Sequence, residues 1–145
     1  MPVTDDQVAA LRAYLSDDMD RYRQLFAGLD REAARSGYAT LLAAAFFEAV
    51  DRRFAEDGTT ADVIEFVADV RTRSQALGEV IDPHAAERLI GAALTDEDID
   101  DLDAKAKGRL FAVLLAGLIA DEQLSKDGLD EFLAEARKLA DEWLG

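Results

Sequence analysis

The chemistry open to this sequence depends on one histidine and on clusters of charged side chains. His84 comes two residues after Asp82, which precedes Pro83 in a typical helix-start pattern. A nucleophilic triad needs a histidine near a serine or cysteine. The chain has no cysteine, and none of its serines stands in a nucleophile-elbow motif. We therefore interpret His84 as a partly exposed residue of a first helical turn.

The acidic segment 96–103 is the candidate metal site. Carboxylate oxygens are the ligands that calcium and magnesium prefer, so this segment could hold either cation weakly. An EF-hand read from residue 96 would need glycine at its sixth position and glutamate at its twelfth, where this sequence has Asp101 and Lys107. A di-iron site in a helical bundle would need a second histidine. The alternative is a solvated helix start. The candidate ligands are Asp96, Asp98, Asp100 and Asp101.

The basic residues do not form a recognisable phosphate or nucleic-acid site. No glycine-rich phosphate loop occurs. Segment 74–94 has helix–turn–helix proportions, but Arg88 is its single basic residue, too few for a recognition helix. The paired arginines are flanked by acids, which favours surface ion pairs; these pairs are Arg21/Arg23, Arg52/Arg53 and Arg71/Arg73.

The charge balance points to a basic partner. The 145 residues include 16 Lys and Arg against 31 Asp and Glu, a net charge of -15. Residues 1–78 hold 9 basic and 14 acidic groups (-5), and residues 79–145 hold 7 and 17 (-10). Such a surface repels nucleic acid and anionic lipid and attracts a basic protein. The alternative is that the charge serves solubility alone.

We expect a cytoplasmic protein. The first residues lack the basic patch and apolar stretch of a signal peptide. The longest apolar run, residues 110–120, is too short to cross a hydrocarbon layer of about 30 Å at about 1.5 Å per residue. We therefore predict no contact with membranes or nucleic acid.

The spacing of the apolar residues predicts an all-α fold. Apolar side chains recur every three or four residues along the whole chain, as in amphipathic helices. We predict a compact bundle of six to seven helices in a single domain, residues 1–145. Helices 38–56 and 108–123 are the most apolar. Small residues recur every four positions in both, so we expect them to cross at the centre.

A possible internal repeat would divide the bundle into two three-helix units. Residues 64–71 resemble residues 130–137 at an offset of 66, and each segment follows an apolar helix and a short polar turn. The repeat would comprise residues 20–77 and 85–144, related by a pseudo-twofold axis. Chance similarity between alanine-rich helices is the alternative.

Capping residues mark the expected helix boundaries. Ser36-Gly37 should end the N-terminal helical region, Gly58 should end helix 38–56 in a left-handed conformation, and Gly78 should end a helix running to Leu77. In that helix we expect Val63, Ile64, Phe66, Val67 and Val70 to face inward. The expected N-terminal caps are Thr4 with Gln7, Thr59 or Thr60, Asp82, Thr95 and Ser125.

Two acidic turns carry a family resemblance. Glu56-Asp57-Gly58 and Ala120-Asp121-Glu122 each follow an apolar helix, and they resemble the acidic turns of tellurite-resistance TerB-like helical domains. Those domains also repeat a helical unit. This sequence departs from the pattern at Glu122, where glycine is expected, and at Gly128, where an acidic residue is expected. No functional residue is therefore carried over.

These observations favour a non-enzymatic protein-interaction or regulatory module. The alternatives are a helical domain that binds a small ligand or a divalent cation, and an enzyme that uses carboxylates alone. We expect no cofactor. Tyr22 and Trp143 are the candidate interface residues, because tyrosine and tryptophan pair an apolar body with a polar tip. The N-terminal stripe 8–29 and the stripe ending at Trp143 could also support a homodimer.

Overall fold

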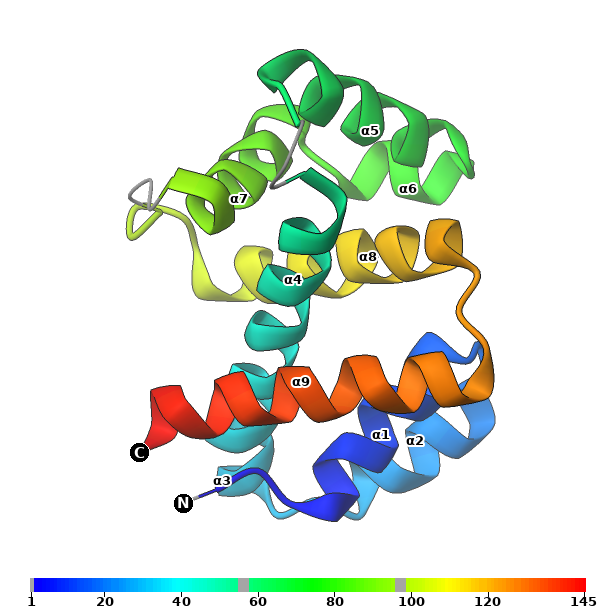
Figure 1. Cartoon of the computed structure of the whole chain (residues 1–145), viewed down its shortest axis with the longest axis vertical. Coiled ribbons are helices and arrows are strands. Elements are labelled where there is room, and N and C mark those ends of the chain that lie inside the picture. Colours follow the sequence, from blue (N-terminus) through cyan, green and yellow to red (C-terminus); the bar gives the residue numbers. More distant parts are fainter. Residues whose placement is uncertain (1, 55–57, 96–98) are drawn as a thin grey trace. The chain divides into compact units, whose positions relative to one another are not determined.

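The computed structural model describes residues 2–54, 58–95 and 99–145, leaving aside the side chains of residues 33–35. No strand occurs in these ranges, so the predicted all-α fold is confirmed (Figure 1). Within the described ranges, the predicted bundle of six to seven helices takes the form of nine α-helices and one π-helix, of which three elements are only three to six residues long. Among the described residues, no helix has both the length and the hydropathy needed to span a membrane. The elements are α1 (Asp5–Leu15), α2 (Met19–Ala27), α3 (Arg31–Ala33), the π-helix η1 (Ala34–Tyr38), α4 (Ala39–Phe54), α5 (Thr60–Thr72), α6 (Gln75–Val80), α7 (Pro83–Thr95), α8 (Ala104–Glu122) and α9 (Lys126–Leu144).

The chain forms two compact units. Unit 1 comprises Met1–Glu48 and Ile119–Gly145, and unit 2 comprises Ala49–Leu118. The chain passes from one unit to the other within α4 and again within α8. These boundaries do not coincide with the predicted repeat 20–77 and 85–144. The single-domain organisation, the pseudo-twofold axis and the crossing of the two apolar helices stay predictions.

In unit 1, the N-terminal segment is hydrogen-bonded to α9. The backbone N–H of Val3 donates to Oδ1 of Asp141 at 2.7 Å, and Arg137 donates to the Val3 carbonyl oxygen at 2.7 Å. Arg137 also pairs with Asp5 at 2.7 Å. The Val3 side chain is buried. The predicted capping box of Thr4 and Gln7 is confirmed at the start of α1, because each side chain bonds the other residue's backbone N–H.

In unit 2, capping residues define α5 and α6. Thr59 and Asp62 form a capping box at the start of α5, so of the two threonines proposed as its cap, Thr59 is the correct one. Ser74 caps α6 by accepting a hydrogen bond from the backbone N–H of Leu77. The prediction of one helix to Leu77, ended by Gly78, is therefore wrong: α5 ends at Thr72, and Gly78 lies inside α6.

Gly37 and Gly58 both lie where a Cβ atom would clash with a neighbouring residue. Gly37 lies within η1, which continues directly into α4, so the predicted break at Ser36-Gly37 is wrong. A Cβ atom on Gly37 would clash with the buried side chain of Gln7. The predicted left-handed Gly58 is also wrong, because no described glycine has positive φ. A Cβ atom there would clash with the backbone of Phe54.

Other helix-start predictions divide between confirmed and wrong. Ser125 caps α9 through Gly128, and Asp82 accepts a hydrogen bond from Ala85 at the start of α7, both as predicted. The prediction that Thr95 caps the next helix is wrong, because Thr95 ends α7 and its hydroxyl donates to the Gly91 carbonyl oxygen. Asp103 instead accepts from the Ala106 N–H as α8 begins at Ala104.

Candidate functional site

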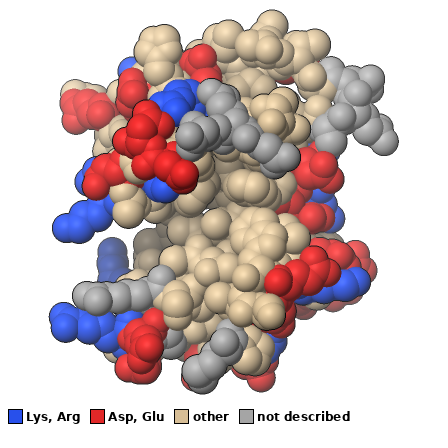
Figure 2. All heavy atoms as spheres, turned by 90° about the vertical axis from the view of Figure 1, so that its left-hand side faces the viewer, with Lys and Arg blue, Asp and Glu red and all other residues tan. Residues whose placement is uncertain are grey.

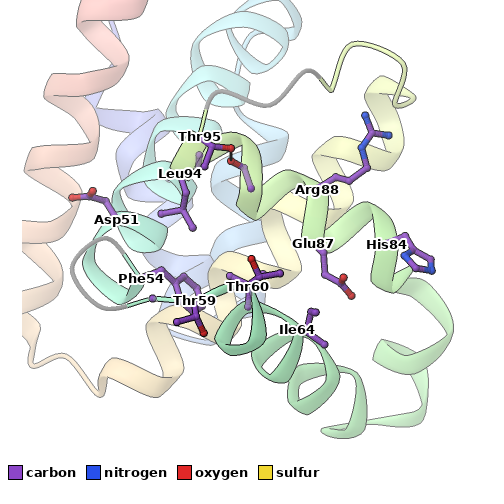
Figure 3. Close-up of a pocket in the computed structure, with 14 residues that line it drawn as sticks. Asp51, Phe54, Thr59, Thr60, Ile64, His84, Glu87, Arg88, Leu94 and Thr95 are labelled. Atoms are coloured by element: carbon purple, nitrogen blue, oxygen red, sulfur yellow. Dashed lines mark hydrogen bonds between the residues drawn. The ribbon is translucent and has the colours of Figure 1, made fainter.

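A groove of about 590 Å³ lies within unit 2, between α7 and the first turns of α5. Its volume is within the range of ligand-binding clefts. The end of α4 contributes Asp51 and Phe54 at one end of the groove. Figure 3 shows the labelled lining residues. The lining consists of Asp51, Phe54, Gly58, Thr59, Thr60, Val63, Ile64, His84, Glu87, Arg88, Gly91, Ala93, Leu94 and Thr95.

Helix α7 has two faces, and one of them follows the groove. Its buried side chains are Ala86, Leu89, Ile90 and Ala92. Residues three or four positions apart share one face of a helix, and a second set with that spacing lines the groove. Gly91 lies in the middle of this set, so no side chain rises there above the backbone. The set consists of His84, Glu87, Arg88, Gly91, Leu94 and Thr95.

Helix α5 places an apolar side chain on the other wall. Its buried face consists of Val63, Phe66, Val67 and Val70, as predicted. The prediction that Ile64 also faces inward is wrong, because Ile64 is 46% exposed. Successive residues of an α-helix are about 100° apart around the axis, so Ile64 lies beside the buried face rather than on it. Ile64 therefore lines the groove and remains open to a binding partner.

Carboxylates set the charge of the groove. Asp51 and Glu87 line it, and no hydrogen bond or ion pair joins either side-chain carboxylate to another described residue. In Figure 3, Glu87 points from α7 toward α5, whereas Arg88 extends away from α5. Arg88 donates to both carboxylate oxygens of Asp101, at 2.7 and 2.9 Å. These hydrogen bonds hold the pKa of Asp101 below its ordinary value, so the pair is fully charged near neutral pH.

The candidate metal ligands fall into two groups. Asp96 and Asp98 lie outside the described residues. Asp100 and Asp101 are described and exposed, and the carboxylate of Asp101 is already bonded to Arg88. Within the described ranges, no three histidine or acidic side chains are grouped in a way that could hold a metal ion. The metal site therefore stays a prediction.

The candidate interface residues Tyr22 and Trp143 belong to unit 1 and do not line the groove. The Tyr22 ring contacts Tyr14 and Phe26, with centroid distances of 5.4 and 5.6 Å. Burial, and then the neighbouring Tyr22, raise the pKa of Tyr38 in the same cluster. Trp143 is 46% exposed and contacts Phe47 edge-on at 5.3 Å. The two residues thus take part in different ring contacts.

A second hollow, of about 430 Å³, lies in unit 1 and has the opposite charge. Its lining includes Arg12 and Lys126 and no carboxylate. Arg12 is bonded to Asp130 of α9 at 2.8 Å. This hollow therefore offers a basic partner no charge complementarity, and the groove in unit 2 is the stronger candidate site.

Comparisons with known proteins give no further guide: no family model, curated protein or solved structure matches this chain. The resemblance to TerB-like domains thus gains no support. Of its two turns, Glu56 and Asp57 lie outside the described residues, and Asp121 and Glu122 end α8.

The groove itself could not be predicted from the sequence. The spacing of the groove face of α7 was visible in the sequence, but the partner wall was not. Recognising the groove requires knowing that α5 lies beside α7, which is a contact between residues distant in the chain. The exposed His84 was placed correctly in the first turn of its helix, although its position in the groove was not foreseen.

Proposed function

We propose that this protein is a cytoplasmic, non-enzymatic interaction module that binds a basic amphipathic helix in the groove between α5 and α7. The observation that carries the proposal is the exposed Ile64 in a groove with two carboxylates. An amphipathic helix places its apolar side chains in such a groove at positions i, i+3, i+4 and i+7. Lysine or arginine residues at the edge of that helix would lie near Asp51 and Glu87.

The dimensions of the groove suit a short helix. The groove face of α7 runs from His84 to Thr95, which corresponds to about 16 Å at about 1.5 Å per residue. Leu94 supplies apolar contact at one end and Ile64 supplies it farther along (Figure 3), whereas Phe54 is only 4% exposed. The flat backbone at Gly91 allows a partner helix to approach closely. The apolar lining provides affinity, and the carboxylates select a basic partner.

The overall acidity of the chain supports a basic partner but does not locate it. On the face shown in Figure 2, acidic and basic side chains lie in mixed groups rather than in one acidic patch. Residues 49–118, which form unit 2, hold 8 basic and 15 acidic groups, a net charge of -7. This excess should speed the association with a basic partner at low salt.

The proposal is tested with a helical peptide of leucine and lysine, about 16 residues long, with leucines at the i, i+3, i+4 and i+7 spacing. Binding is measured by fluorescence anisotropy, and the binding site is mapped by amide chemical shifts. We expect shift changes along the groove faces of α5 and α7. Ile64→Ser should weaken binding about tenfold, because the buried area of one isoleucine is lost. Glu87→Gln should weaken peptide binding more at low salt than at high salt.

Matched variants separate groove binding from general attraction to an acidic protein. Val80 is also an exposed branched apolar residue, at 51%, and it does not line the groove. Glu135 is an exposed glutamate of unit 1. Val80→Ser and Glu135→Gln should bind the peptide as the unaltered protein does. Equal losses in Ile64→Ser and Val80→Ser, or shift changes confined to unit 1, would contradict the proposal.

A small cationic ligand is the second candidate occupant, and the volume of about 590 Å³ favours it. An amine with an apolar body would use the same carboxylates and the same apolar lining. Thermal unfolding in the presence of amines and divalent cations distinguishes the two, because a ligand of the native state raises the melting temperature. A rise that Ile64→Ser abolishes, without any binding of the peptide, would favour the small ligand.

The homodimer predicted from the sequence is tested separately, by light scattering with and without peptide.

A further inference from the structure

Arg88 is the cation that could oppose the carboxylates of the groove. Asp51 and Glu87 contribute two negative charges to the lining, and Arg88 contributes one positive charge. These three side chains together give the lining a formal charge of -1. A guanidinium over the groove would repel a basic helix and would also attract Glu87.

The Arg88 guanidinium is bonded to a residue outside the groove. Its two terminal nitrogens donate to the two oxygens of Asp101, a two-point geometry that fixes the plane of the guanidinium. Asp101 precedes α8 and is not part of the groove lining. Figure 3 shows Arg88 extending away from α5, whereas Glu87 points toward it. With Arg88 balanced by Asp101, the lining keeps a formal charge of -2.

We propose that Asp101 determines the charge specificity of the groove by holding Arg88 away from it. Asp101 is a positioning residue, because it acts through Arg88 and does not touch the partner. The inference rests on the proposed function, since it assumes that the groove binds a helix. It explains why a groove suited to a basic partner has an arginine in its lining.

The test compares the unaltered protein with the variants Asp101→Asn, Arg88→Gln and Asp101→Asn/Arg88→Gln. Each is titrated with the leucine–lysine peptide and with a leucine–glutamate peptide of the same spacing. Asp101→Asn should weaken binding of the basic peptide about three- to tenfold and strengthen binding of the acidic one. Removing Arg88 as well should restore the affinity for the basic peptide. A merely structural role for Asp101 would not give this rescue.

Asp130→Asn is the matched control. It breaks the Arg12–Asp130 pair of unit 1, whose side chains are 31% and 59% exposed, compared with 34% and 66% for Arg88 and Asp101. The Asp130→Asn variant should retain the selectivity of the unaltered protein. If it loses selectivity to the same extent as Asp101→Asn, the effect belongs to net charge and the inference fails.

A measurement without peptide separates this inference from the proposed function. In Asp101→Asn, nuclear Overhauser contacts should appear between the Arg88 side chain and the Ile64 methyl groups. If they do not appear, or if selectivity is unchanged although the peptide binds in the groove, the role of Asp101 is disproved. If they appear but no peptide binds even to the unaltered protein, the proposed function fails and the positioning of Arg88 stands.

Discussion

Helices α5 and α9 have the same pattern of buried side chains, yet they differ in chemistry at the outward position held by Ile64 in α5 and by Asp130 in α9. At the offset of 66, each buried residue of α5 has a buried counterpart in α9. The N-terminal caps also correspond, because Thr59 and Ser125 each accept a hydrogen bond from a backbone N–H three residues later. The buried pairs are Val63 and Leu129, Phe66 and Phe132, Val67 and Leu133, and Val70 and Ala136.

The outward position differs in chemistry. Asp130 of α9 is bonded to Arg12 of α1 within unit 1. Its counterpart in α5 is Ile64, which lines the groove of unit 2 and is 46% exposed. The buried residues of each helix make its packing contacts, so the fold does not constrain the residue at this outward position. The comparison teaches that packing fixes the buried residues of the two helices, whereas the residue at this outward position is charged in one unit and apolar in the other.

The largest expected effect tests whether the two buried faces are equivalent. Phe66 is 2% exposed and Phe132 is fully buried. Phe66→Ala and Phe132→Ala should each lower the free energy of unfolding by about 3–5 kcal/mol, because each leaves a cavity in a packed core. Chemical denaturation of each variant measures the loss. Phe26→Ala is the control: Phe26 is 38% exposed, so its loss should be smaller. A cost below about 1 kcal/mol at either buried phenylalanine would break the comparison.

The local features of this comparison could be read from the sequence, whereas the difference could not. A cap such as Ser125 bonds a backbone N–H three residues away, so neighbouring residues determine it. The spacing of apolar residues likewise predicted the buried face of α5. Ile64 was misplaced because it lies beside that face, where packing against other helices decides exposure. Similarly, the pairing of Arg88 with Asp101 joins residues 13 positions apart, which local spacing does not predict.

The intermediate effect concerns the caps. Thr59→Ala and Ser125→Ala should each cost about 1 kcal/mol, since each leaves a backbone N–H of the first turn without its partner. The two starts differ in one respect: the Asp62 carboxylate accepts a hydrogen bond from the Thr59 N–H, whereas Gly128 of α9 has no side chain to accept one. Asp62→Ala should therefore also lower the free energy of unfolding, by less than Thr59→Ala does. Urea denaturation measures each change. Thr60→Ala is the control, because Thr60 is a neighbouring threonine that does not cap α5.

Asp62→Ala also tests the alternative that the cap of α5 depends on Thr59 alone. An unchanged midpoint in Asp62→Ala, together with a lowered midpoint in Thr59→Ala, would show that the returned hydrogen bond adds nothing. The starts of α5 and α9 would then be equivalent in energy as well as in position. The difference between the two helices would in that case be confined to their outward residues.

The smallest expected effect is the exchange of those outward residues. Ile64→Asp should change the free energy of unfolding by no more than about 0.5 kcal/mol, because the side chain is on the surface. Asp130→Ile removes a surface ion pair and should cost about 0–1 kcal/mol. Thermal and urea denaturation measure both. A loss above about 2 kcal/mol for Ile64→Asp would place Ile64 among the residues that stabilise unit 2. Its apolar character would then be explained by packing, and its place in the groove would no longer indicate a partner.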